Sequence, residues 1–166
     1  ASQEHSRRLI DILPDAVCLI HPKGELLAVN SQAVAMLGYA STEELLHKNI
    51  YDLTAPAEHA RVKADFVVAL KAGIIRNAEF TMLKKSGEAF RVELSATVSL
   101  GIHGQSTGLL SVVRDITERQ RAQQALLASE ERFRQLAQHI REVFWMSNVE
   151  KTEMIYVSPA YEEIWG

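Results

Sequence analysis

The sequence predicts an α+β domain with a five-stranded antiparallel sheet, followed by a long coiled-coil-type helix. Three observations predict this fold: the order of the elements, a long alternating strand, and a change of composition at Asp115. In residues 88–99 the apolar side chains alternate with polar ones, which indicates a strand with one buried face. A register slip of one residue would turn that face to water, so the pairing is well specified. Its apolar members are Phe90, Val92, Leu94, Ala96 and Val98.

The composition is that of an ordinary globular protein with room for one core and an additional segment. The chain has 166 residues, 47% of them hydrophobic, and a net charge of −3. Because no basic excess is present, we expect no nucleic-acid partner and no membrane contact. Apolar runs are too short to span a bilayer. The single cysteine, Cys18, forms no internal disulfide, and a cytoplasmic location is expected.

The first part of the chain predicts a helix and a β-hairpin. Residues 2–13 are polar with apolar pairs near their end and predict an amphipathic helix that Pro14 stops, so residues 1–14 form an N-terminal helical segment. Residues 16–20 are a compact apolar run typical of a buried strand. A turn at residues 21–24 and a second strand at 26–29 complete the hairpin.

Three helices and three strands follow and complete a domain over residues 15–117. The first helix is capped by Asn30 or Ser31 and ends at Gly38. The other helix signals are a capping-box spacing and a proline-initiated helix that ends at glycine; they are Ser41 with Glu44, Thr54 with Pro56, and Gly73. The expected strands are residues 77–85, 88–99 and 109–113, with turns or loops at 85–88 and 101–108.

A linker helix is expected over residues 118–140, where no glycine or proline occurs. Asp115 and Glu118 have the spacing of another capping box. Small or apolar residues repeat at coiled-coil spacing in Ala122, Leu126, Ser129, Phe133, Leu136 and Ile140. We expect this face to pair with a second chain; the alternative is a single helix packed on its own domain.

The last residues of the chain repeat the first ones. Residues 142–146 align with 15–19, residues 155–158 with 27–30, and residues 164–166 with 36–38. Residues 141–166 are therefore predicted to be the truncated N-terminal part of a second copy of the domain, and the chain to be part of a longer protein.

Four short motifs, in this order and spacing, resemble the PAS family of sensory domains over residues 9–117. They are Leu37-Gly38-Tyr39, Lys48-Asn49-Ile50, Lys85-Ser86-Gly87 and Asp115-Ile116-Thr117. The resemblance implies a sheet that cradles small helices around a pocket. It also implies a helix that passes signals to an effector, often a histidine kinase or a cyclic-dinucleotide enzyme.

The resemblance disfavours flavin and haem. Flavin-binding members carry a reactive cysteine where this chain has Ile50. They also carry inward polar amides where it has Met82, Val92 and Val113. Haem-binding members carry a proximal histidine near Val62, whereas His59 stands one turn earlier and is expected on the solvated surface. No histidine shows metal-ligand spacing, so no metal is expected.

An apolar pocket remains as the candidate site. Its expected lining is Phe66, Leu70, Phe80, Met82, Val92, Leu94, Ser111 and Val113. Either it holds an unknown small, mostly apolar ligand oriented by Ser111, or the same side chains close the space. No catalytic motif is present, so no enzymatic activity is expected in this segment. Cys18 is expected to be buried and inert, and a redox role for it is the alternative.

These observations predict a signal-sensing and dimerisation module of a multi-domain protein, in particular a sensor histidine kinase. The signal would pass through Asp115, Ile116 and Thr117 to the linker helix. We expect a homodimer through the N-terminal and linker helices, and an effector domain in the same chain. The alternatives are a passive dimerisation or spacer module, and a sensory module of a diguanylate cyclase or phosphodiesterase.

Overall fold

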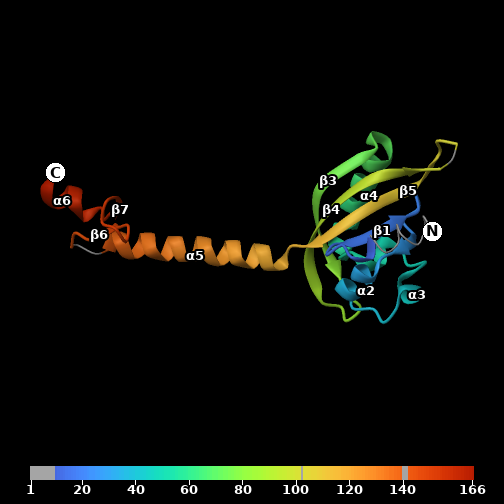
Figure 1. Ribbon diagram of the computed structural model, residues 1–166, viewed down its shortest axis with the longest axis horizontal. Coiled ribbons are helices and arrows are strands. Elements are labelled where there is room, and N and C mark those ends of the chain that lie inside the picture. Colours follow the sequence, from blue (N-terminus) through green and yellow to red (C-terminus); the bar gives the residue numbers. More distant parts are fainter. Residues whose placement is uncertain (1–9, 102, 140–141) are drawn as a thin grey trace. The chain divides into compact units, whose positions relative to one another are not determined.

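Five antiparallel strands form the sheet of the first of two units in the computed structural model, which describes residues 10–101, 103–139 and 142–166 (Figure 1). The first unit ends at Glu118 and the second begins at Arg119. The order in the sheet is β2-β1-β5-β4-β3, which confirms the predicted α+β fold. The strands are β1 (Ala16–Ile20), β2 (Leu26–Val29), β3 (Ile74–Leu83), β4 (Ala89–Leu100) and β5 (Ser106–Asp115).

The alternation predicted in β4 is present. Phe90, Val92 and Ala96 are buried on one face, and Leu94 and Val98 of that face are half-buried. β5 is the central strand, since it pairs with both β1 and β4. Because of this register, Ser111 lies between Cys18 of β1 and Ala96 of β4. The middle of the sheet is therefore lined by small side chains.

The helices pack against the same core as the sheet. α2 (Ser31–Leu37) is capped by the Asn30 side chain and ends at Gly38, whose φ of 71° is the left-handed conformation that favours glycine. α3 (Thr42–Leu45) and the 3-10 turns η1 (Ile50–Leu53) and η2 (Pro56–Glu58) lead to α4 (His59–Ala72). The core joins residues of these helices to the strands; among them are Ala33, Leu37, Leu45, Leu53 and Val62.

Two details of the helix starts differ from the sequence prediction. Ser41 makes no side-chain cap on α3, and Glu44 instead accepts the backbone N–H of Ala40 at 3.0 Å and pairs with Lys85. The capping box predicted there is wrong because a distant lysine on the β3–β4 turn engages the glutamate. A capping box does form at η1: the Asp52 carboxylate accepts the backbone N–H of Asn49, and the Asn49 side chain accepts a backbone N–H of the turn.

α5 (Thr117–His139) begins one residue after β5 ends. The Asp115 Oδ1 atom accepts the N–H of Thr117 at 2.8 Å. In a capping box the side chain would accept the N–H of the residue three positions ahead, Glu118. Asp115 instead bonds Thr117, so the predicted capping box is wrong. Among the residues that the structure describes, no helix has the length and hydropathy needed to cross a membrane.

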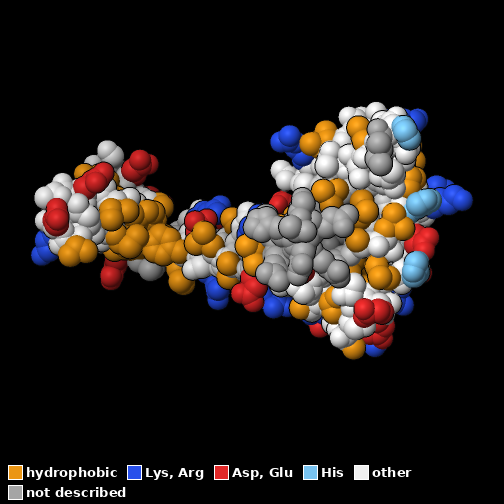
Figure 2. All heavy atoms as spheres, turned by 45° about the vertical axis from the view of Figure 1, so that its right-hand side comes forward, with side chains coloured by type: hydrophobic (Ala, Val, Ile, Leu, Met, Phe, Trp, Pro, Cys, Tyr) orange, Lys and Arg blue, Asp and Glu red, His pale blue; other side chains and the backbone are white. Residues whose placement is uncertain are grey.

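The second unit contains all of α5 except its first two residues, a hairpin and a short helix. The hairpin consists of β6 (Trp145–Ser147) and β7 (Met154–Val157), and α6 (Ala160–Trp165) follows it. The ring of Phe133 packs edge-on against Phe144 and Tyr156, with centroid distances of 6.4 and 5.1 Å. Phe133 therefore packs against its own hairpin while 38% of it stays exposed, and its predicted place in the coiled-coil face stays a prediction. Figure 2 shows hydrophobic side chains gathered on the surface of this unit.

The other residues of the predicted coiled-coil face differ in what the structure shows of them. Leu126 and Leu136 are more than half exposed, so pairing with a second chain stays a prediction. Ile140 and residues 1–9 of the predicted N-terminal helix lie outside the described residues. Residues 10–11 are helical, and a bend precedes β1.

The two hairpins are held by equivalent side chains. Asn30 Oδ1 accepts the N–H of Val17 at 2.9 Å, and Asn30 Nδ2 donates to the carbonyl of Asp15 at 3.1 Å. In the second unit, Ser158 Oγ accepts the N–H of Phe144 at 3.1 Å and donates to the carbonyl of Glu142 at 3.3 Å. Asn30 and Ser158 occupy aligned positions of the internal repeat, as do their partners. In each hairpin, one polar side chain thus bonds the equivalent backbone N–H and carbonyl groups.

Candidate functional site

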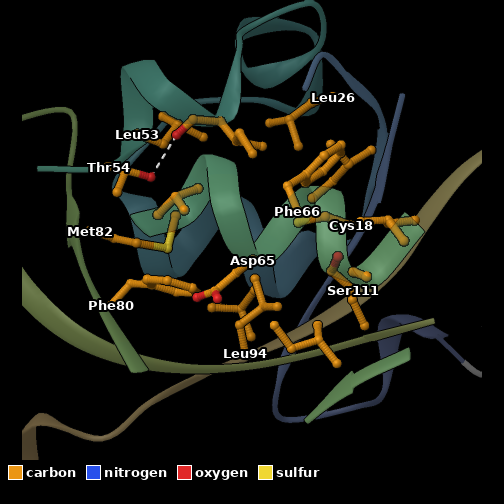
Figure 3. A pocket seen from close by; sticks show the side chains of 18 of the residues that line it. Cys18, Leu26, Leu53, Thr54, Asp65, Phe66, Phe80, Met82, Leu94 and Ser111 are labelled. Atoms are coloured by element: carbon orange, nitrogen blue, oxygen red, sulfur yellow. Dashed lines mark hydrogen bonds between the residues drawn. The ribbon is translucent and has the colours of Figure 1, made fainter. Parts of the chain in front are cut away.

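A cavity of about 70 Å³ lies in the first unit between α4 and the inner face of the sheet (Figure 3). Its walls come from all five strands, α2, α4 and the segment around η1, and they are almost entirely apolar. Small side chains line this region, Ala69 from α4 and the paired residues Ala96 and Ser111 from β4 and β5. Because none of them fills the gap between helix and sheet, space remains where larger residues would close it.

The structure brings together six of the eight side chains predicted to line a pocket. They are Phe66, Phe80, Met82, Leu94, Ser111 and Val113. Leu70 packs instead against the cluster of Ala69, Ala96 and Leu109, since it lies one residue further around α4. Val92 is fully buried in the main core without bordering the cavity. The period-two pattern identified the inward face of β4, but not which members of that face lie beneath α4.

Asp65 is a lining residue that the sequence reasoning missed. It is the only charged side chain among the described lining residues, and it is half-buried. Figure 3 shows its carboxylate lying among the apolar side chains, near Phe80 and Leu94. The helical spacing of Val62, Asp65 and Ala69 places the carboxylate on the buried stripe of α4, and this spacing was the available signal.

Ser111 provides the buried polar group of the cavity. The residue is 1% exposed, and its Oγ has no hydrogen-bond partner among the described residues. A buried polar atom without a partner costs about 1–3 kcal/mol. Thr54, another hydroxyl of the lining, already donates to the carbonyl of Ile50 at 2.7 Å. Ser111 is therefore the hydroxyl that is available to a molecule in the cavity.

Cys18 also borders the cavity, but its chemistry is suppressed. Burial raises the pKa of the Cys18 thiol to about 12, so the side chain stays protonated at neutral pH. Because the thiolate is the reactive form, this environment makes the thiol a poor nucleophile. The burial predicted for Cys18 is present.

The strand that floors the cavity also leads into α5. Val113 borders the cavity, and two residues later Asp115 caps the N–H of Thr117. Ile116, which separates β5 from α5, is 1% exposed and donates its N–H to the carbonyl of Arg91 at 3.0 Å. The path from cavity wall to helix therefore contains no loose segment.

An exposed ion pair fixes the same end of β5 to β1. The guanidinium of Arg114 bonds both carboxylate oxygens of Asp15, at 3.0 and 2.7 Å. The hydrogen bond and charge of Asp15 raise the pKa of Arg114 above its ordinary value. Because the geometry is bidentate, it sets the position of the strand end more sharply than a single contact would.

The residues compared above with flavin- and haem-binding positions lie in different surroundings. Ile50, Met82 and Val113 line the cavity with apolar side chains, and Val92 lies outside it. His59 is half-buried, and its Nε2 lies 2.9 and 3.0 Å from the carbonyls of Tyr51 and Thr54, which corrects its expected place as a solvated histidine. Nowhere in residues 10–101, 103–139 and 142–166 do three or more His, Cys, Asp or Glu side chains gather in a metal-binding group. That neither flavin nor haem binds stays a prediction.

Comparison with known families decides the identity of the first unit. The family described as PAS fold matches residues 4–116, which is more than half of the chain. The chain belongs to the PAS family. The resemblance drawn from the four short motifs is thereby confirmed, together with the fold that it implied.

Solved PAS domains and curated signalling proteins are similar to this chain. A PAS domain from Colwellia psychrerythraea has a TM-score of 0.65 at 23% identity, covering 71% of this chain and 99% of that one. The PAS domain of a two-component sensor histidine kinase has a TM-score of 0.59 at 21% identity, covering 69% and 96%. Sporulation kinase A of Bacillus subtilis is 27% identical over 96% of this chain, which spans 27% of that kinase's length. These likenesses support a sensory signalling role for the PAS domain.

Proposed function

We propose that this PAS domain senses a signal in its cavity and relays it through α5 to an effector domain of the same protein. The observation that supports the proposal is the continuity of β5. Ser111 and Val113 border the cavity, and the same strand ends at the capped start of α5. A shift of the strand by a ligand is therefore transmitted to the helix without a flexible linker. Such a ligand must bind the two states of the domain with different affinity.

The parent protein that we favour is a sensor histidine kinase. The kinase names of the similar proteins support this choice, and the chain spans about a quarter of the length of sporulation kinase A. Catalysis then belongs to another domain, and the PAS domain supplies regulation. A diguanylate cyclase or phosphodiesterase is the alternative effector, because nothing in the first unit depends on the chemistry downstream.

A homodimer through the N-terminal and linker helices fits this role. Leu126 and Leu136 of the predicted coiled-coil face of α5 are 60% and 64% exposed, and such leucines are costly to leave in water. Pairing along α5 would bury these leucines, and the two paired helices would then rotate together as one coiled coil. We place the domain in the cytoplasm, in accord with its single buried thiol.

Residues 142–166 fit the start of a second PAS domain in the same chain. The support is the shared bonding of Asn30 and Ser158 in the two hairpins. Such a tandem arrangement makes α5 the connection between two sensory domains, with the effector beyond the second.

Asp115→Ala in the full-length protein tests the relay. The substitution removes the acceptor of the Thr117 N–H, and loss of such a cap costs about 0.5–2 kcal/mol of helix stability. We expect faster hydrogen exchange at residues 117–121 and an effector output that no longer follows the signal. Asp115→Asn is the matched control, since it keeps the accepting oxygen. An output that is unchanged in Asp115→Ala would remove the basis of the proposal.

A second pair of variants tests whether the cavity is the origin of the signal. Ser111→Leu fills the cavity, whereas Val112→Leu places the same leucine side chain on the opposite face of β5, where Val112 is 38% exposed. We expect Ser111→Leu alone to alter exchange at residues 117–121 and effector output. Equal effects of the two variants, or none, would favour a passive spacer.

A further inference from the structure

The cavity presents two polar side chains that have no partner among the described residues. Ser111 Oγ is buried and bonds to nothing. Asp65 is half-buried, and no described residue bonds to its carboxylate. Figure 3 shows both side chains directed among the cavity residues, Asp65 from α4 and Ser111 from β5. A ligand in this cavity would meet a half-buried carboxylate and a buried, unpartnered hydroxyl between mostly apolar walls.

We propose that the cavity binds a small aliphatic primary ammonium ion. The ammonium group donates to the Asp65 carboxylate, and the alkyl chain lies along the apolar walls. A hydroxyl at the far end of the chain, where one is present, bonds to Ser111. This proposal deepens the proposed function by naming the chemical class of the ligand, and it depends on the cavity being the sensory site.

Charge favours a cation over the other small molecules that the volume admits. None of the described residues that line the cavity is a lysine, arginine or histidine, so an anionic ligand would meet the Asp65 carboxylate without compensation. An uncharged apolar ligand would leave the buried Ser111 hydroxyl unsatisfied and offer nothing to the Asp65 carboxylate. An ammonium ion forms a charge-assisted hydrogen bond with the carboxylate, which is roughly twice as strong as a neutral one.

The size of the cavity limits the ligand. One water molecule needs roughly 10–15 Å³ of such volume, so a cavity of about 70 Å³ accepts a chain of a few non-hydrogen atoms. The walls that such a chain would contact come from Phe66, Phe80 and Leu94, all without hydrogen-bonding groups. Short unbranched amines match both the volume and the polarity.

Pentylamine, aminopentanol, pentanol and pentanoate are the probes of this proposal. Each is added to the purified chain at neutral pH and constant ionic strength, with binding measured by calorimetry and by the melting temperature. We expect the two amines to bind and to raise the melting temperature, because ligands of the native state stabilise it. Pentanoate should not bind, and pentanol should bind more weakly than pentylamine.

Asp65→Asn distinguishes charge pairing from shape. It preserves the volume of the side chain, and we expect it to weaken pentylamine binding roughly tenfold or more while leaving pentanol binding unchanged. Glu130→Gln makes the same change of charge on α5, outside the lining residues, and should have no effect. Ser111→Ala should weaken aminopentanol binding more than pentylamine binding. The melting temperature of each variant without ligand reports whether it folds.

Two results would overturn the proposal. One is equal binding of pentylamine and pentanol by the wild type; the other is undiminished pentylamine binding by Asp65→Asn. Neither result bears on the relay, because hydrogen exchange at residues 117–121 in Ser111→Leu and Asp115→Ala tests that without any ligand. Conversely, an amine that binds with no change in effector output would support this site and contradict the relay.

Discussion

Replacing Asn30 by alanine should cost the first unit a large part of its stability. Asn30 is 4% exposed, and its Oδ1 accepts the N–H groups of Val17 and Ala33 at 2.9 and 3.0 Å. Its Nδ2 donates to the carbonyls of Ile10 and Asp15, both at 3.1 Å. One amide thus joins the start of β1, the start of α2 and the segment before β1.

The magnitude follows from what the alanine leaves unsatisfied. Val17 and Ala33 are buried, so their two N–H groups lose an acceptor that water does not replace. At about 1–3 kcal/mol for each, the expected loss is roughly 2–6 kcal/mol. The carbonyl of exposed Ile10 can reach water and adds little. Against a typical unfolding free energy of about 5–15 kcal/mol, this loss is severe.

Asn30→Ser is the matched control, and the chain itself supplies the reason. At the aligned position, Ser158 makes the equivalent bonds to Phe144 and Glu142 with its hydroxyl. A serine at position 30 should therefore retain the bonds to Val17 and Asp15, and should lose about half as much free energy as the alanine.

Urea unfolding followed by the amide NMR signals of β4 and β5 measures this effect. Tryptophan fluorescence would report on the wrong part of the chain, because Trp145 and Trp165 both lie in the second unit. The reasoning would be refuted by a loss below about 1 kcal/mol in Asn30→Ala, or by equal losses in the serine and alanine variants.

Two further predictions concern the pKa values of single groups. Since burial raises the pKa of Cys18 to about 12, iodoacetamide at pH ~8 should label the native thiol about a thousandfold more slowly than the urea-unfolded thiol; comparable rates would show that the thiol is accessible. The bond from Lys85, and then that from the Ala40 N–H, lower the pKa of Glu44. This carboxylate therefore stabilises the fold above its unfolded pKa, and the contribution disappears as pH falls through the folded pKa. Urea titrations should show Glu44→Gln less stable than wild type at neutral pH and equal to it in acid, and a difference that persists in acid would contradict the assignment.

The sequence predicted those parts of the fold that local patterns determine. The alternation of β4 identified its buried face, and Asn30 and Gly38 marked both ends of α2 correctly. A capping motif, in contrast, depends on what else reaches its side chains. Glu44 is bound by Lys85, which the β3–β4 turn brings to it from a distant part of the sequence. Asn49, which does cap a helical turn, is also tied to the carbonyl of Lys23.

The cavity was less predictable than the core around it, because a cavity depends on the combined volume of side chains from several elements. Ala69, Ala96 and Ser111 are each unremarkable in sequence, and only the pairing of β4 with β5 beneath α4 brings them together. Asp65 was missed because a charged residue on a helix is ordinarily assigned to the solvated face. Its spacing from Val62 and Ala69 contradicts that assignment, and this spacing is the stronger criterion.

The pairing of β5 indicates where a signal would act. From Leu109 to Val113 the strand is paired on both sides, with β1 and with β4. Beyond Val113, only β4 continues to pair, through Asp115 and Val92, and the other side is held by the exposed bonds between Arg114 and Asp15. Moving the doubly paired part would break two ladders, whereas moving the end would disturb the pairing with β4 alone, together with the bond from Ile116 to Arg91 and this ion pair. We infer that the relay acts on residues 114–116, and that the cavity biases this end rather than displacing the whole strand.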